Sequence, residues 1–207
     1  MNAPPKVIII DFDGTIVDSN EIWKNAYKSF VLNNGYTFHK YLYDNHGLIS
    51  FDDWERQIIM VYETEKTPES ILKEIKENAI ILLSRIPPRK SFKKYINQNT
   101  KSSIIVISKE EKNIIQPYLK RFYLSDIRQD IHNYRNEVKL YEDMAKEFEC
   151  QTNEITLIDD SLSHCIASKN AGCITIGIND NHSKERQKQM ISVCDMYVHD
   201  FTPLLTF

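Results

Sequence analysis

The sequence predicts an α/β fold with a parallel sheet, interrupted by one inserted all-helical domain. Two observations predict the sheet: short runs of β-branched residues recur along the chain, and helix-like segments separate them. A third predicts the insertion, because residues from about 20 to 86 contain helical patterns and no strand-like run. At 207 residues and 42% hydrophobic content, the chain is long enough to bury a core.

The predicted strands are continuous apolar runs rather than alternating ones, which is typical of strands buried on both faces of a parallel sheet. They are Val7–Ile10, Ile104–Ile107, Ile155–Ile158, Ile174–Ile178 and Met196–Val198. The predicted helices around them are Phe92–Asn97, Glu111–Phe122, Lys139–Phe148 and Leu162–Asn170. Pro117 is a residue that can kink or interrupt the second of these helices.

The inserted domain is predicted to contain three helices, at Asn20–Asn33, Ser50–Glu65 and Pro68–Ile86. Thr67 is suited to cap the third helix, with Pro68 at its first position, and Asp18 is expected to cap the first. Trp23, Tyr27 and Phe30 form a stripe at helical spacing, which predicts packing between these helices. The predicted boundaries are residues 17–88 for the helical domain, with residues 1–16 and 89–207 forming the core.

Charge and cysteine content narrow the function classes. The chain has 26 Lys and Arg against 29 Asp and Glu, so its net charge is −3, which predicts neither a nucleic-acid nor a membrane-surface partner. The four cysteines form no CxxC pair, so neither a zinc site nor a disulfide framework is expected. With no signal-like or membrane-spanning run, the expected location is the cytoplasm.

Chemically useful residues follow three of the predicted strands. The first strand ends in Asp11 and Asp13, the second in Ser108 and the third in Asp159-Asp160. Ligands bind outside the carboxyl ends of strands in open α/β sheets, so these side chains are expected to meet there. Carboxylates held that close need a cation, and oxygen ligands suit a hard ion such as Mg²⁺.

A magnesium site, a carboxylate nucleophile, a hydroxyl and a lysine together predict phosphoryl transfer. The transferred group spreads negative charge over its oxygens, so its reaction depends on positioning and on charge neutralisation. Lys139, which precedes a predicted helix and the third strand, is placed to neutralise such a phosphate.

The segment DFDGTIVDS resembles the first motif of the haloacid dehalogenase superfamily, DxDGTxxDS. Ser108 resembles the second motif of that family, Lys139 the third, and Asp159-Asp160-Ser161 the fourth. The resemblance implies a Rossmannoid parallel-sheet core with an all-helical cap domain, as in the branch that contains phosphoglycolate phosphatases and β-phosphoglucomutases.

The resemblance also implies a role for each residue. Asp11 would be the nucleophile, and Asp13 the general acid and base, whose backbone carbonyl also binds Mg²⁺. Asp160 would be a metal ligand, and Asp159 either a second ligand, direct or through water, or a residue that supports the ligands. Ser108 and Lys139 would hold the phosphate. Gly14 and Thr15 are further expected substrate-binding residues, and Lys109 is either a third one or a solvated lysine. His46, Arg56 and Tyr62 are polar candidates for specificity in the cap.

The expected function is therefore an Mg²⁺-dependent phosphatase for a small phosphorylated metabolite. A phosphomutase, a phosphoprotein phosphatase and a regulatory protein that keeps the fold are the alternatives.

Leu140 stands where the family usually has a proline after the motif-three lysine, so Arg128 and Arg135 are possible substitutes for Lys139. Trp23 stands where the mutases have a histidine, which argues against a mutase. A calcium-binding EF-hand loop would lie between two helices, whereas a strand is predicted before Asp11. A receiver domain would have its lysine last, whereas Lys139 precedes the final acidic pair.

Overall fold

The computed structural model describes residues 4–45, 51–62, 66–108, 112–122, 124, 127–131, 137–179 and 184–206. Within these residues, a parallel sheet of six strands has the order β3-β2-β1-β4-β5-β6. The strands are β1 (Val7–Asp11), β2 (Ser103–Ser108), β3 (Arg128–Ile131), β4 (Ile155–Asp159), β5 (Ile174–Ile178) and β6 (Met196–Val198). The predicted α/β fold class is confirmed.

The central strands form because their β-branched side chains pack on both faces of the sheet. Residues Val7 to Ile10 of β1 are completely buried, and so are Ile155, Leu157 and Ile158 of β4. β1 pairs with β2 on one side and with β4 on the other, so it lies in the middle of the sheet. A continuous apolar run is what such a position requires.

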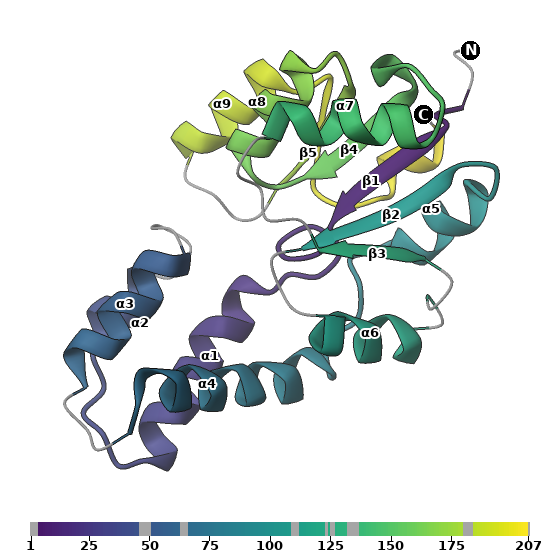
Figure 1. Cartoon of the computed structure of the whole chain (residues 1–207). Helices are drawn as coiled ribbons and strands as arrows, with labels where there is room; N and C mark the ends of the chain where they lie inside the picture. Colours follow the sequence, from purple (N-terminus) through teal and green to yellow (C-terminus); the bar gives the residue numbers. More distant parts are fainter. Residues whose placement is uncertain are drawn as a thin grey trace. The chain divides into compact units, whose positions relative to one another are not determined.

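Helices cover both faces of the sheet, as Figure 1 shows. One face carries α7 (Glu137–Glu147), α8 (Leu162–Asn170) and α9 (Lys184–Val193), and the other carries α5 (Phe92–Gln98) and α6 (Lys112–Arg121). Tyr141 and Met144 of α7 and Ala167 of α8 pack with Val7 and Ile9 in one buried cluster. Short 3₁₀ turns, η1 (Thr152–Glu154) and η2 (Pro203–Thr206), precede β4 and end the described chain.

The chain divides into two compact units, a core unit of Met1–Asp18 and Pro87–Phe207 and a helical unit of Ser19–Ile86. The helical unit contains α1 (Asn20–Asn33), α2 (Lys40–Asn45), α3 (Phe51–Val61) and α4 (Pro68–Leu83). Thr67 caps α4 as predicted, because its side chain accepts a hydrogen bond from the Ser70 backbone N–H at 3.3 Å. None of the described helices is long and apolar enough to cross a membrane.

An aromatic cluster forms the interior of the helical unit. Trp23, Tyr27 and Phe30 are at most 7% exposed, so the prediction that this stripe packs inside the helical domain is confirmed. The Tyr27 and Tyr62 hydroxyls are hydrogen-bonded at 2.6 Å, and Tyr62 also donates to the Thr37 carbonyl at 3.1 Å. These contacts give both phenols partners inside the cluster.

Three local expectations differ from the structure. Asp18 does not cap α1, because Ser19 occupies the N-cap position and Asp18 instead forms an ion pair with Arg89 at 3.9 Å. The helix α6 continues through Pro117 to Arg121 rather than ending there. The strand β3 and the short helix α2 were not predicted, since neither has a strong apolar periodicity.

Candidate functional site

The candidate site begins where three neighbouring strands end. The residue register places Asp11 at the end of β1 beside Ile107 of β2, one residue before Ser108. On the other side, Ile10 pairs with Ile158, so Asp11 and Asp159 both follow that pair. Three residues far apart in the sequence therefore meet at the carboxyl edge of the sheet, where ligands of α/β proteins bind.

The acidic side chains at this edge form a compact cluster. Carboxylate oxygens of Asp11, Asp159 and Asp160 all lie within 4.8 Å of one another. Asp11 is 8% exposed and Asp159 is completely buried, so bulk water screens their charges poorly.

Burial and mutual repulsion both act on Asp11. Burial is the larger cause that raises the pKa of its carboxyl well above the usual 3.8, and the charges of Asp159, Asp160 and Asp13 raise it further. A hydrogen bond from the Phe12 backbone acts in the opposite direction. Without a cation, the cluster therefore favours a proton on Asp11.

The donor set fits a hard divalent cation. Three carboxylates offer oxygen ligands close enough to share one ion, and a cation between them would remove the repulsion that raises the pKa of Asp11. Asp11, Asp159 and Asp160 are therefore the residues that could hold Mg²⁺.

This electrostatic arrangement predicts how stability depends on pH. In metal-free protein, Asp11 keeps its proton at pH values where the unfolded chain has lost it, so the folded state binds more protons. The free energy of unfolding should therefore fall as the pH rises from about 4 through the raised pKa. Mg²⁺ should raise the melting temperature more at pH 8 than at pH 5, measured by circular dichroism against a sample in EDTA. An equal shift at both values would contradict the prediction.

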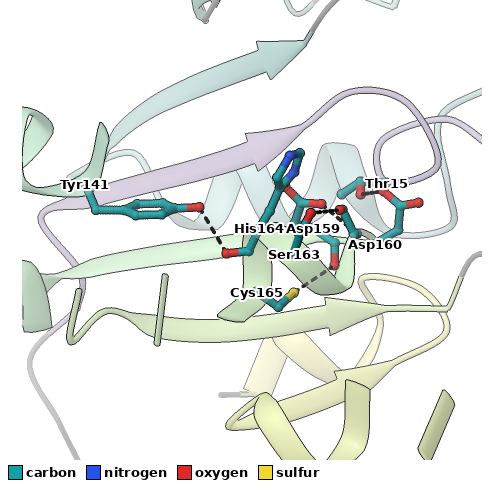
Figure 2. A network of polar contacts seen from close by, with 8 residues as sticks. Thr15, Tyr141, Asp159, Asp160, Ser163, His164 and Cys165 are labelled. Carbon is teal, nitrogen blue, oxygen red and sulfur yellow. Dashed lines mark hydrogen bonds and ion pairs between the residues drawn. The ribbon is translucent and has the colours of Figure 1, made fainter. Parts of the chain in front are cut away.

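The loop after β1 packs against the cluster through its glycine. Gly14 has a φ of +75°, and a Cβ atom there would lie 2.5 Å from Oδ2 of Asp160. Thr15, which is completely buried, donates its hydroxyl to Oδ1 of Asp160 at 3.2 Å (Figure 2). The residues predicted to bind substrate at positions 14 and 15 thus lie against a predicted metal ligand.

Asp13 and Ser108 meet across the same loop. The buried Ser108 hydroxyl donates to Oδ2 of Asp13 at 3.2 Å. The charge of Asp13 also acts on Asp11, so its carboxylate lies close to the cluster. The structure therefore brings together Asp11, Asp13, Ser108, Asp159 and Asp160.

Arg89 contacts the loop after β1, although it lies far along the chain, just after the chain returns from the helical unit to the core unit. Its guanidinium donates two hydrogen bonds to the Gly14 carbonyl, at 2.7 and 3.1 Å, and its backbone N–H donates to the Ile16 carbonyl at 2.8 Å. Sequence reasoning missed this residue, because nothing local marks an arginine that contacts a loop 75 positions earlier.

His164 is the second residue whose contact was not foreseen. Its Nδ1 lies 2.9 Å from Oδ2 of Asp159, and the Ser161 backbone N–H donates to the other carboxylate oxygen at 2.8 Å. Figure 2 shows the imidazole beside Asp159, with Cys165 and Tyr141 contacting backbone carbonyls nearby. The contacts from His164 and Ser161 fix the orientation of the Asp159 carboxylate. The sequence signal that could have predicted the His164 contact is its spacing, five residues after Asp159 across a strand–helix turn.

The described contacts do not bring Lys139 to the cluster. It lies on α7 with 61% of its side chain exposed, and its ammonium pairs with Asp143 one turn further on. The suggested substitute Arg128 pairs with Glu147 at 2.6 Å. Lys109 and Arg135, like His46 of the helical unit, lie outside the described residues.

The two remaining specificity candidates have structural partners in the helical unit. Arg56 forms an exposed ion pair with Asp53 at 3.6 Å. Tyr62 is only 7% exposed and belongs to the aromatic cluster, so it contributes to packing.

Three solved structures with the same fold show what the chain is similar to. A protein of Thermotoga maritima assigned as a β-phosphoglucomutase aligns with a TM-score of 0.79 at 15% identity, covering 97% of both chains. A protein of Haemophilus somnus assigned as a phosphoglycolate phosphatase gives 0.75 at 16% identity, covering 97% of this chain and 96% of that one. CbbY of Rhodobacter sphaeroides, in complex with xylulose-(1,5)bisphosphate, gives 0.73 at 14% identity, covering 97% and 96%. At these identities the likeness establishes the fold alone.

No curated protein sequence matches the chain. The family model for haloacid dehalogenase-like hydrolases matches residues 8–178, which include all the clustered residues described above. The match spans most of the sequence, from β1 to the end of β5. The chain therefore belongs to the haloacid dehalogenase-like hydrolase family.

Proposed function

We propose that the protein is an Mg²⁺-dependent phosphatase that hydrolyses the phosphate monoester of a small metabolite through an aspartyl-phosphate on Asp11. The observation that carries the proposal is that a cluster of carboxylates suited to a metal ion and a separate carboxylate, Asp13, lie at the same edge of the sheet. Asp11 shares an oxygen-rich cluster with Asp159 and Asp160, while Asp13 accepts a hydrogen bond from Ser108 beside it.

In the first step, a carboxylate oxygen of Asp11 bonds to phosphorus, and the bond from phosphorus to the substrate's alcohol oxygen breaks. Asp13 gives its proton to that leaving oxygen, so the alcohol departs neutral. The Ser108 hydroxyl, which donates to Asp13 in this structure, would turn to donate to a phosphate oxygen. A bound Mg²⁺ would supply charge neutralisation for the phosphate and for the cluster.

In the second step, the ionised Asp13 takes a proton from water. The water oxygen bonds to phosphorus, the bond between phosphorus and Asp11 breaks, and inorganic phosphate leaves with Asp11 restored as a carboxylate. Asp13 thereby ends the cycle protonated, as it began. Lys139 remains a candidate phosphate contact under this proposal, and to act it has to exchange Asp143 for the phosphate.

The test is phosphate release from a panel of sugar, nucleotide, organic-acid and aryl phosphates. We expect hydrolysis with Mg²⁺ that falls to background in EDTA and returns when Mg²⁺ is added in excess. Sugar phosphates are analysed for isomerised product as well as for free phosphate, because isomerisation faster than release would instead indicate a mutase. Hydrolysis that is unaffected by EDTA, or none with any substrate class, would refute the proposal.

A further inference from the structure

The core unit has a hollow formed by residues other than those of the carboxylate cluster. It has a volume of about 340 Å³ and is lined by residues 88–94 together with Arg121 and Phe122. These residues come from the segment that leads into α5, from the first turn of α5, and from the end of α6 with the residue after it. Both helices cover the same face of the sheet (Figure 1). The volume lies within the range of small-molecule pockets.

The lining of this hollow is strongly basic. Five of the nine lining residues carry a positive charge, namely Arg89, Lys90, Lys93, Lys94 and Arg121. The sequence around them is equally biased: residues 78–109 contain no Asp or Glu but seven Lys or Arg, in a chain with a net charge of −3. Five positive side chains thus line one hollow of a protein whose net charge is negative.

Most of these charges lie at the rim and are accessible to a ligand. Lys90, Lys93, Lys94 and Arg121 are exposed residues, whereas the side chain of Arg89 is 13% exposed and donates to Gly14. Because exposed ammonium groups remain hydrated, an anion can bind them without separating a buried ion pair.

Aromatic side chains at the end of α6 support the Arg121 guanidinium on one side of the hollow. Its guanidinium lies over the Phe122 ring, 5.9 Å from the centroid, and the Tyr118 ring supports Phe122 with centroids 4.8 Å apart. An arginine packed on an aromatic ring loses less side-chain freedom when it binds an anion.

Among the described residues, two carboxylates lie near this lining, and the first is the ion-pair partner of Arg89 described above. The Phe201 backbone N–H donates to the Lys90 carbonyl at 3.1 Å, which brings the neighbouring Asp200 close. The Asp200 carboxylate accepts the Thr202 backbone N–H at 2.6 Å. Against these two carboxylates, the five basic groups are still in excess.

We propose that this hollow is a binding site for a compact oligophosphate anion, separate from the catalytic cluster. A ligand with several charges is required because at least four exposed cations surround the opening. A compact ligand is favoured over a nucleic-acid strand because the charges surround a hollow of about 340 Å³. The site does not depend on the proposed phosphatase activity, since it uses none of the clustered carboxylates.

The test is isothermal titration of the whole protein with inorganic tripolyphosphate, without divalent cations and at low salt. Under these conditions the carboxylate cluster repels anions, so binding there does not contribute. We expect one saturable site in the unchanged protein, with an affinity that falls as salt is added. The double variant Lys90→Ala/Lys94→Ala should bind at least about tenfold more weakly, because it loses two charge-assisted contacts.

The matched control is Lys184→Ala/Lys188→Ala, which removes two exposed lysines at the same spacing from α9. This control should bind tripolyphosphate within about twofold of the unchanged protein, since both double variants lower the net charge equally. Circular dichroism checks that each variant is folded. The proposal is overturned if the unchanged protein does not bind tripolyphosphate, if both variants lose affinity equally, or if single-stranded nucleic acid binds more tightly than tripolyphosphate.

Discussion

Replacing Asp11 by asparagine is expected to abolish phosphate release while making the metal-free protein more stable at neutral pH. The amide cannot form the acyl-phosphate bond, so under the proposed function kcat should fall by at least about 10³-fold. Free phosphate, measured with saturating Mg²⁺ and the best substrate of the panel, gives this ratio.

The expected gain in stability has a separate physical origin. Burial and, after it, the charges of Asp159 and Asp160 raise the pKa of Asp11, so ionising Asp11 in the folded protein costs free energy. Asparagine has a similar shape and removes that charge. In EDTA at pH 8, urea unfolding should show a gain on the order of 1 kcal/mol, because the substitution removes a buried charge that no cation compensates. Near pH 4 the gain should be small, since the Asp11 carboxyl of the folded, unchanged protein is then neutral, like the amide that replaces it.

The matched control for this substitution is Asp53→Asn on α3, where the carboxylate is 54% exposed and faces Arg56. The Asp53→Asn variant should keep full activity, and in EDTA its free energy of unfolding should not exceed that of the unchanged protein by a margin that grows with pH. An Asp11→Asn protein that still releases phosphate would refute the role of Asp11. An Asp11→Asn protein that is less stable than the unchanged protein at pH 8 in EDTA would refute the electrostatic account, whatever its activity.

The central strands could be predicted because each needs apolar side chains on both faces. A run such as Val7 to Ile10 satisfies that requirement without reference to the rest of the chain. The strand β3 could not be found in this way, because its sequence, RQDI, contains three polar residues, and it lies at the edge of the sheet. Its pairing with Ile105–Ser108 of β2 is decided by the tertiary structure.

The same distinction applies to the candidate site. Asp11, Ser108 and Asp159 were predictable because strand ends in a parallel sheet converge, and this follows from topology alone. The contacts of Arg89 with Gly14 and of His164 with Asp159 depend on where loops and helix ends return in space. No spacing rule in a single sequence specifies those positions, so sequence reasoning finds the reactive groups more readily than the residues that hold them.

Gly14 provides the second large expected effect, because two separate constraints exclude a side chain there. A Cβ atom would lie 2.5 Å from Oδ2 and 2.7 Å from Cγ of Asp160, distances at which one group has to move. The φ of +75° adds the cost of a left-handed backbone for any other residue, about 1–2 kcal/mol. Gly14→Ala should therefore destabilise the protein by about 3 kcal/mol in urea unfolding.

Gly35→Ala separates these two constraints, because Gly35 has a similar φ of +66° but no neighbouring atom within 4 Å of the position that a Cβ atom would take. This variant should lose only the backbone cost of about 1–2 kcal/mol, and should keep the Mg²⁺ dependence of the unchanged protein. In Gly14→Ala, the displaced Asp160 also loses its hydrogen bond from Thr15, so the Mg²⁺ concentration for half-maximal activity should rise at least about tenfold. If both variants lose the same stability and keep the same Mg²⁺ dependence, Gly14 is required only for its backbone conformation, and the close approach to Asp160 has no part in holding the metal site.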